Sequence, residues 1–152
     1  SALGYNYRLS NVLASIGRAQ LKVLDGKIKR KREIFNRYVQ AFSLLPGIGF
    51  MPEASYGTST RWLSAFTIDK KQFKSSSLDI IKHLSNHNIE SRPVWKPLQL
   101  QPLYKRYKFF PHTKDFSVSE DIFQKGVCLP SGTGMNKDDQ QRVINCITNL
   151  KL

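Results

Sequence analysis

Two histidines, His83 and His87, have the spacing that most directly suggests chemistry in this chain. Four residues apart on a predicted helix, their imidazoles share one face, which is the arrangement of a zinc-binding helix. No glutamate follows His83, and the sequence shows no third ligand, which a zinc site needs. We therefore interpret the pair as surface histidines and predict no metal site.

Gly132-Thr133-Gly134 stands before a predicted helix N-terminus, a place that suits an anion. This Gly-x-Gly lacks the remainder of a dinucleotide-binding or P-loop pattern, so an ordinary turn before a capped helix is favoured. No serine or cysteine stands in a nucleophile elbow or a cysteine-protease signature. The residues by themselves thus indicate no catalytic group.

Positive charge is the strongest bias of the composition, because 24 lysines and arginines against 11 acidic residues give a net charge of +13. Such a chain attracts polyanions, whether nucleic acid, acidic lipid or phosphorylated small molecules. The densest run could contact a phosphate backbone, or it could be the solvated face of a helix whose aliphatic stems cover apolar surface. No helix-turn-helix or zinc-finger pattern accompanies it, so the solvated face is favoured. The run comprises Lys22, Lys27, Lys29, Arg30, Lys31, Arg32 and Arg37.

One long helix at the start of the chain is expected to position many of these residues. An apolar stripe at helical spacing starts at Leu9 and continues to Phe42, and Ser10 is the expected N-cap. A continuous helix over residues 10–42 would be about 50 Å long, which is typical of an element that connects two bodies or packs in an oligomer. Asp25-Gly26 is the expected position of a bend.

The rest of the chain predicts short strands mixed with helices. We expect an α+β fold, in which a long N-terminal helix is followed by a small two-layer domain of about three strands with helices on one side. Residues 1–44 would form an interface turn and a connecting helix, and residues 45–152 the small C-terminal domain. Strands are predicted near residues 48–50, 62–68, 89–94 and 127–129, and helices near 77–87, 117–125 and 136–150.

The composition also bears on where the protein works. No apolar run approaches the ~20 residues of a membrane span, so no membrane partner is expected. The chain shows no basic stretch followed by an apolar one, the mark of a secretory signal. Cys128 and Cys146 stand in different local settings and are interpreted as free thiols in a reduced compartment. We therefore expect a cytoplasmic protein.

Four parts of the sequence, taken together, carry a resemblance to a known family. They are Gly4-Tyr5-Asn6-Tyr7-Arg8-Leu9-Ser10-Asn11 with Gly17-Arg18-Ala19-Gln20-Leu21; Arg61-Trp62-Leu63; Ile89-Glu90-Ser91-Arg92-Pro93-Val94-Trp95-Lys96-Pro97-Leu98; and Val127-Cys128-Leu129-Pro130-Ser131-Gly132-Thr133-Gly134. The first, a Tyr-Asn-Tyr-Arg turn that opens a long helix, is the most specific. In this order the segments span nearly the whole chain and resemble the DegT/DnrJ/EryC1/StrS family of pyridoxal-phosphate-dependent aminotransferases, which act on nucleotide-linked keto-sugars.

The resemblance implies the architecture of fold type I aminotransferases, with a large cofactor domain, a small C-terminal domain and a dimer. This chain would match only the end of the large domain and the small domain. The family's catalytic lysine forms a Schiff base with pyridoxal 5'-phosphate near a Gly-Glu-Gly-Gly stretch, which this chain lacks. We therefore expect the C-terminal part of such an enzyme, with no catalytic residue of its own and no activity by itself.

The resemblance also implies binding residues. Asn6 and Arg8 are the expected contacts on the cofactor side: Asn6 would hydrogen-bond the cofactor phosphate of the neighbouring subunit, and Arg8 would offer its guanidinium to a phosphate, that of the nucleotide-sugar. From the residues alone, a helix-entry turn with a surface arginine would be favoured. Arg92 and Trp95 would line the sugar-nucleotide side of the site. Gln99 stands where family members often carry histidine, and we include it as a substrate-binding residue that bears on substrate choice.

The predicted activity of the complete protein is the transfer of an amino group, from glutamate, to a 4-keto or 3-keto nucleotide-linked sugar. This chain would supply phosphate contacts in trans, in a homodimer formed through the N-terminal helix. Two other interpretations remain open. One is a basic nucleic-acid-binding module that uses the run at residues 22–37, and the other is a dimerisation module whose surface is the helix over residues 10–42.

Overall fold

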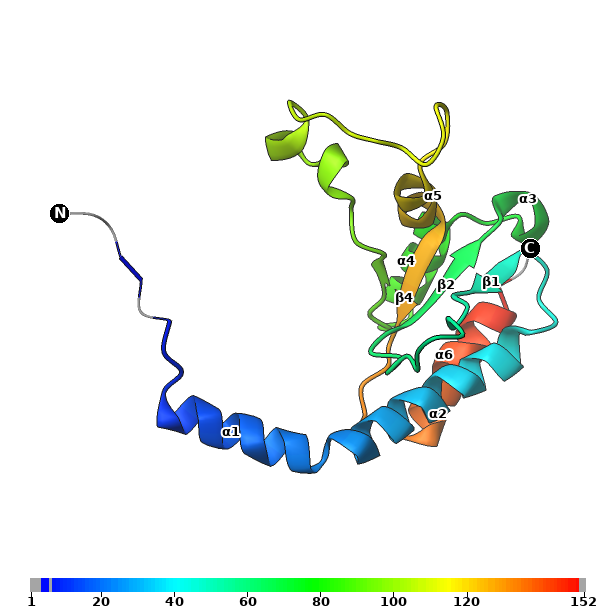
Figure 1. Cartoon of the computed structure of the whole chain (residues 1–152). Helices are drawn as coiled ribbons and strands as arrows, with labels where there is room; N and C mark the ends of the chain where they lie inside the picture. The colour runs from blue at the N-terminus through cyan, green and yellow to red at the C-terminus, as the bar shows by residue number, and fades with distance from the viewer. Residues whose placement is uncertain (1–3, 6, 151–152) are drawn as a thin grey trace.

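The helical start of the chain consists of two helices in the computed structural model, which describes residues 4, 5 and 7–150. They are α1 (Asn11–Lys22) and α2 (Leu24–Phe42), and they meet at an angle (Figure 1). The backbone leaves helical geometry at Val23 (φ −109°, ψ 5°), a β-branched residue with a weaker helix preference. The expected long helix is therefore interrupted, and the break falls just before Asp25-Gly26, which lies inside α2.

A four-stranded antiparallel sheet follows, with the strand order β1-β2-β4-β3. Its strands are β1 (Ile48–Phe50), β2 (Ser64–Ile68), β3 (Arg92–Pro93) and β4 (Gly126–Leu129). All four lie at the predicted strand positions, although a domain of about three strands was expected. β3 is much shorter than the strand predicted over residues 89–94, because proline has no N–H to donate and is tolerated only at a sheet edge. Ala65 and Arg92 both pair with Cys128, so β4 lies between β2 and the short edge strand.

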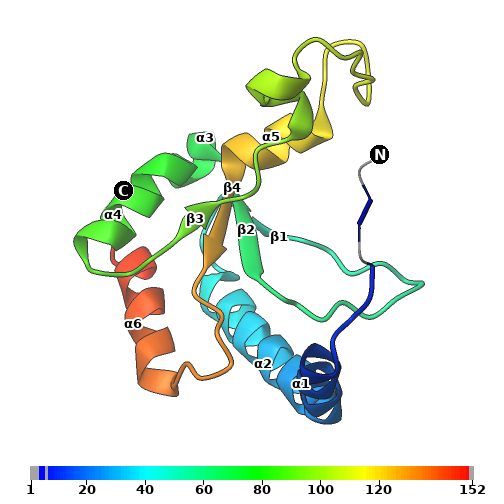
Figure 2. The ribbon, with the colours of Figure 1, turned by 90° about the vertical axis from the view of Figure 1, so that its left-hand side faces the viewer.

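Three helices cover one face of the sheet, and the core lies between them and the strands (Figure 2). These are α2, α4 (Ser77–Asn86) and α6 (Lys137–Thr148). Along β2 every second side chain is buried, as a sheet with one covered face requires. This arrangement confirms the predicted α+β class with helices on one side. The core comprises Ile34, Tyr38, Phe42, Phe66, Ile68, Phe73, Ile80, Leu84, Ile89, Val127, Leu129, Val143, Ile144 and Ile147.

Local side-chain chemistry starts the helices where the sequence predicts. The Ser10 hydroxyl accepts a hydrogen bond from the Leu13 amide (3.3 Å), and the Asn136 side chain accepts one from the Asp139 amide (2.7 Å). Both residues are therefore N-caps, which satisfy backbone donors that the first turn leaves without partners. Within the described ranges, no helix is long and apolar enough to cross a bilayer.

The segment between β3 and β4 projects from the body of the fold (Figure 1). It holds two short 3-10 turns, η1 (Leu98–Leu100) and η2 (Pro102–Tyr104), and returns through α5 (Val118–Lys125). Many of its large side chains are exposed rather than packed on the core. A further short helix, α3 (Lys70–Phe73), follows β2 and was not predicted; it places Phe73 in the core.

Candidate functional site

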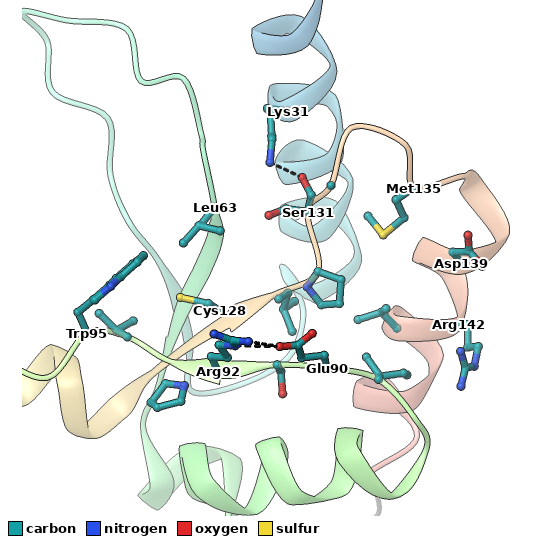
Figure 3. A pocket seen from close by; sticks show the side chains of 18 of the residues that line it. Lys31, Leu63, Glu90, Arg92, Trp95, Cys128, Ser131, Met135, Asp139 and Arg142 are labelled. Atoms are coloured by element: carbon teal, nitrogen blue, oxygen red, sulfur yellow. Dashed lines mark hydrogen bonds and ion pairs between the residues drawn. The ribbon is translucent and has the colours of Figure 1, made fainter. Parts of the chain in front are cut away.

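A cavity of about 960 Å³ lies beside β3 and β4 (Figure 3). Its walls come from the segment around β3, from β4 and the loop that follows it, from α6, and from Lys31 on α2. Because the tightly paired strands β3 and β4 hold Arg92 opposite Cys128, the sheet fixes where the segment around β3 enters the cavity wall. The structure thus brings together the third and fourth of the segments that carry the family resemblance.

Arg92, a predicted substrate-binding residue, lies at this cavity. Its Nη2 and Nε donate to Glu90 Oε1 at 2.5 Å and 2.8 Å. Both side chains are about three-quarters exposed (78% and 74%), so this ion pair contributes little to stability, about 0–1 kcal/mol. A guanidinium held by so weak a pair can exchange its partner for a phosphate, whose oxygens accept its planar donors equally well.

Trp95, also predicted, stacks on Trp62 beside the same cavity, with ring centroids 5.5 Å apart and an interplanar angle of 28°. Both indoles remain about two-thirds exposed (62% and 66%). An exposed pair of stacked aromatic rings presents a flat apolar surface with an N–H at its edge, which suits a nucleotide base or a sugar ring. Trp62 was noted in the sequence without a role, and its importance follows only from the contact with Trp95.

Gln99 is not brought to this cavity. Its Nε2 donates to Ser119 Oγ at 2.9 Å and to Glu120 Oε1 at 3.2 Å, so the side chain fastens η1 to α5. Two other residues that line the cavity were not predicted from the sequence. One of them, Ser91, has a buried Oγ without a hydrogen-bond partner in the part of the chain that the structure describes.

Lys31 is the second residue that sequence reasoning missed. Its Nζ donates to the Ser131 carbonyl at 2.6 Å (Figure 3), which ties the loop after β4 to α2. It also donates to the Trp62 carbonyl at 2.9 Å. Burial lowers the pKa of Lys31 below its ordinary value. In the sequence Lys31 is one of seven cations in a run, and nothing local separates it from the others.

Other cations of that run also bind within the fold, which differs from the solvated face we favoured. Arg30 Nη2 donates to the Met135 carbonyl at 2.7 Å, and Arg37 Nη1 to the Lys137 carbonyl at 2.8 Å. Arg32 pairs with Glu53 at 2.7 Å. Arg30 and Arg37 hold the start of α6 and the loop before it against α2, and Arg32 holds the loop between β1 and β2. These arginines therefore work as structural donors rather than as a surface open to a polyanion.

The predicted contacts at the chain's start lie apart from the cavity. Tyr5, Tyr7 and Arg8 belong to an exposed arm ahead of α1, and none of the three lines the cavity. Asn6 lies outside the described residues, so its predicted contact stays a prediction. Figure 1 shows the arm leaving α1 without touching the sheet. The two halves of the predicted site are therefore separate within one copy of this chain.

Comparisons with known proteins place this arrangement in a family. The family model of the DegT/DnrJ/EryC1/StrS aminotransferase family matches residues 1–148. A Bacillus subtilis protein named "Putative pyridoxal phosphate-dependent aminotransferase EpsN" is 48% identical over 150 residues, which are 99% of this chain and 38% of that protein. A GDP-perosamine synthase of Vibrio cholerae is 32% identical over 147 residues, 97% of this chain and 39% of that protein.

Solved structures share the fold. DesV of S. venezuelae, crystallised with a ketimine intermediate, superposes with a TM-score of 0.81 at 22% identity, over 99% of this chain and 39% of that one. Helicobacter pylori PseC, an aminotransferase of pseudoaminic acid biosynthesis, gives a TM-score of 0.80 at 20% identity, over 98% and 39%. This chain spans between a third and two-fifths of the length of the relatives it matches. On the match over residues 1–148, the chain belongs to the DegT/DnrJ/EryC1/StrS aminotransferase family.

Proposed function

We propose that this chain is the C-terminal part of a pyridoxal-phosphate-dependent enzyme that transfers an amino group from glutamate to a nucleotide-linked keto-sugar. The observation that carries the proposal is the cavity at Arg92 and Trp95 in a chain of this family. A guanidinium beside two stacked indoles matches a ligand with phosphates and a flat ring system. The names of relatives in this family, among them GDP-perosamine synthase, support a sugar nucleotide as that ligand.

The residues of this chain fit the phosphate contacts of a pyridoxal phosphate site but do not provide the lysine that binds the cofactor covalently. When bound, pyridoxal phosphate supplies an electron sink for the carbon that carries the amino group. Lys31, the half-buried lysine at the cavity, donates to two carbonyls and is therefore not a free amine for a covalent bond. Asn6 and Arg8 are proposed to contact phosphates from the arm. The covalent attachment is assigned to a lysine of the complete protein outside this chain, and this chain alone is proposed to be inactive.

For the substrate, each cavity residue is given one task. Arg92 would leave Glu90 and bind a phosphate of the nucleotide, and Trp95 would stack on the base or the sugar. Lys31 acts as a positioning residue, since it holds the backbone of Trp62 and Ser131 in place. Gln99 also fits a positioning role, because its contacts with α5 fix the start of the projecting segment rather than reach the cavity.

A homodimer through the N-terminal helices is proposed as the working assembly. α1 buries none of its residues, and an apolar stripe along it and the arm is open to solvent. In a stable protein such a stripe is covered by another surface. The exposed residues of this stripe are Leu9, Val12, Leu13, Ile16 and Leu21. We also propose a cytoplasmic location, in keeping with the two free thiols Cys128 and Cys146.

The direct test incubates the full-length protein with pyridoxal phosphate, glutamate and a panel of GDP-, UDP- and dTDP-linked 4-keto and 3-keto sugars. The three nucleotides are those in the names of the relatives. We expect one of these sugars to be converted to its amino sugar, detected by mass spectrometry. No conversion of any member of the panel would count against the proposal. As a control, this chain alone should convert none of them.

A further inference from the structure

The histidine pair of α4 gains in the fold the partner that the sequence does not reveal. Cys146 of α6 lies beside His83 and His87, and one ligand atom from each of the three residues lies within 4.8 Å of the other two. The two imidazole rings are 4.5 Å apart between centroids. The cysteine is 59 positions beyond His87 in the chain, and only the packing of α6 on α4 brings it near.

The hydrogen bonds of both imidazoles leave a lone pair on each. His83 Nε2 lies 3.2 Å from the Cys146 carbonyl oxygen, and His87 Nδ1 lies 2.8 Å from the His83 carbonyl oxygen. Because a carbonyl oxygen only accepts, these two nitrogens carry the protons. In a neutral ring the other nitrogen, Nδ1 of His83 and Nε2 of His87, carries the lone pair that a metal would bind. Donation of the second ring N–H to a backbone carbonyl is the usual support of a metal-binding histidine.

The distances and the donor set suit zinc. Bonds of about 2.0–2.1 Å to nitrogen and about 2.3 Å to sulfur put the ligand atoms of a tetrahedral zinc site roughly 3.3–3.6 Å apart. The three ligand atoms lie within 4.8 Å of one another, so the widest pair would have to approach by up to roughly 1.5 Å to share one zinc ion. Two imidazoles and one thiolate form a borderline-soft set, typical of zinc ligands.

We propose that His83, His87 and Cys146 form a zinc site, with water in the fourth position. A cavity of about 570 Å³ at these residues provides room for that water, and Asn145 and Asn149 line it as polar neighbours. Arg142 also lines this cavity and donates to the His87 carbonyl. Its positive charge opposes a cation, so we expect moderate affinity rather than that of a closed structural site with four protein ligands.

The proposed ion would join two helices of the core. His83 lies in α4, His87 is the C-cap of that helix and Cys146 lies in α6, and both helices contribute residues to the core. An ion that binds only the folded chain stabilises it in proportion to the logarithm of the free zinc concentration. The site is distinct from the cavity at Arg92 and Trp95, and its existence does not depend on the proposed aminotransferase function.

The test uses cobalt(II) as a spectroscopic substitute for zinc, added to this metal-free chain. We expect one cobalt ion per chain, with a thiolate-to-cobalt charge-transfer band in the near ultraviolet that added zinc abolishes by competition. Cys146→Ser should lose the band, and His87→Asn should weaken binding at least about tenfold. Zinc should raise the melting temperature of the native chain but not of either variant.

The chain offers a matched control for each ligand. Cys128→Ser removes its other thiol and His112→Asn its other histidine, and both should bind cobalt as the native chain does. His87 is exposed, so His87→Asn tests the site even if Cys146→Ser fails to fold. The proposal is overturned if the native chain shows no saturable binding, if the band survives in folded Cys146→Ser, or if Cys128→Ser removes it.

Discussion

From the sequence, residues of the candidate site could be predicted only where they belong to segments that carry the family resemblance. Arg92 and Trp95 were predicted together, and the structure puts both at one cavity. Lys31 and Trp62 were missed because their roles come from contacts across the fold: Lys31 meets a carbonyl 100 positions away. Gln99, also predicted at the substrate, bonds Ser119 and Glu120 of α5 in this structure, and its predicted contact stays a prediction. The spacing of residues in a sequence predicts only contacts within one element, whereas the contacts of Lys31 and Trp62 join distant parts of the chain.

Trp95 tests the proposed binding surface. In the full-length enzyme, Trp95→Ala should raise KM for the sugar nucleotide by about 5–100-fold, the value of one lost stacking contact, and change kcat less. Trp95→Phe keeps an aromatic face and should lie between the two. Steady-state kinetics with varied sugar nucleotide gives both constants. An unchanged KM in Trp95→Ala would show that the indole does not contact the substrate.

Glu53 anchors the long loop before β2 and predicts a dependence of stability on pH. Its carboxylate accepts from Arg32 and from the Ser59 amide, and these contacts lower the pKa of Glu53 from 4.5 to about 2. Since the folded-state pKa lies below the unfolded one, the stabilisation is complete above pH 4.5 and disappears as the pH falls toward 2.

We therefore expect Glu53→Gln to be less stable than the native chain at pH 7, with a difference that shrinks below pH 4.5. Urea unfolding at several pH values measures it. Glu33→Gln is the matched control, because Glu33 forms an exposed ion pair with Arg30 on its own helix and its loss should change stability little. A difference that stays constant from pH 7 to pH 3 would disprove the role of the Glu53 carboxylate.

The ends of helices and strands could be predicted where a local side-chain interaction determines them. They were predicted less well where packing determines them. Ser10 and Asn136 were recognised as caps because a side chain that bonds the next turn is a local event. The break at Val23 was not located, since Val23 resembles any other apolar residue of the stripe. β3 was overestimated because its apolar neighbours suggested a strand, whereas Pro93 limits it to two residues.

The two N-terminal helices, α1 and α2, should contribute very differently to the free energy of unfolding. α1 buries no residue, whereas Ile34, Tyr38 and Phe42 of α2 belong to the core. Deletion of residues 1–22 should therefore leave a folded chain whose free energy of unfolding changes by about 1 kcal/mol or less. Phe42→Ala should cost about 3–5 kcal/mol. Chemical denaturation followed by circular dichroism compares the two.

The same experiment examines the predicted domain division at residue 44. A chain of residues 45–152 lacks the three core residues that α2 supplies, so we expect it not to fold cooperatively. The division itself stays a prediction. A cooperative unfolding transition in the 45–152 chain would show that α2 is only a connector, and loss of folding on deletion of residues 1–22 would show that α1 has a structural role within one copy.

At the scale of the whole molecule, the arm and the cavity lie apart within one copy, which fits a site completed by a second subunit. The predicted trans contact can be tested by mixing two inactive full-length variants, one with Arg8→Ala and one without its catalytic lysine. Random re-pairing should make half of the dimers mixed, each with one complete site, and so restore about a quarter of native activity. Activity that stays at the level of the separate variants would place Arg8 in its own subunit's site.

The cationic run at residues 22–37 is better explained by contacts within the fold than by a nucleic-acid module. Arg30, Lys31, Arg32 and Arg37 of the cationic run already donate to carbonyls or a carboxylate within the fold. The fold class and the family could be predicted from patterns that extend along nearly the entire chain. The residues that form the cavity walls could not be predicted from the sequence, because α2 and the loop after β4 meet only in the folded chain.

The central claim is that the complete protein moves nitrogen from an amino acid to a nucleotide-linked sugar. The most direct measurement follows the nitrogen itself, with nitrogen-15 glutamate, pyridoxal phosphate and the keto-sugar nucleotides, and with mass spectrometry of the products. We predict that the full-length protein places the label on a sugar nucleotide, and that Arg92→Ala does so more slowly at limiting substrate. Label that stays in glutamate with every keto-sugar nucleotide would contradict the account.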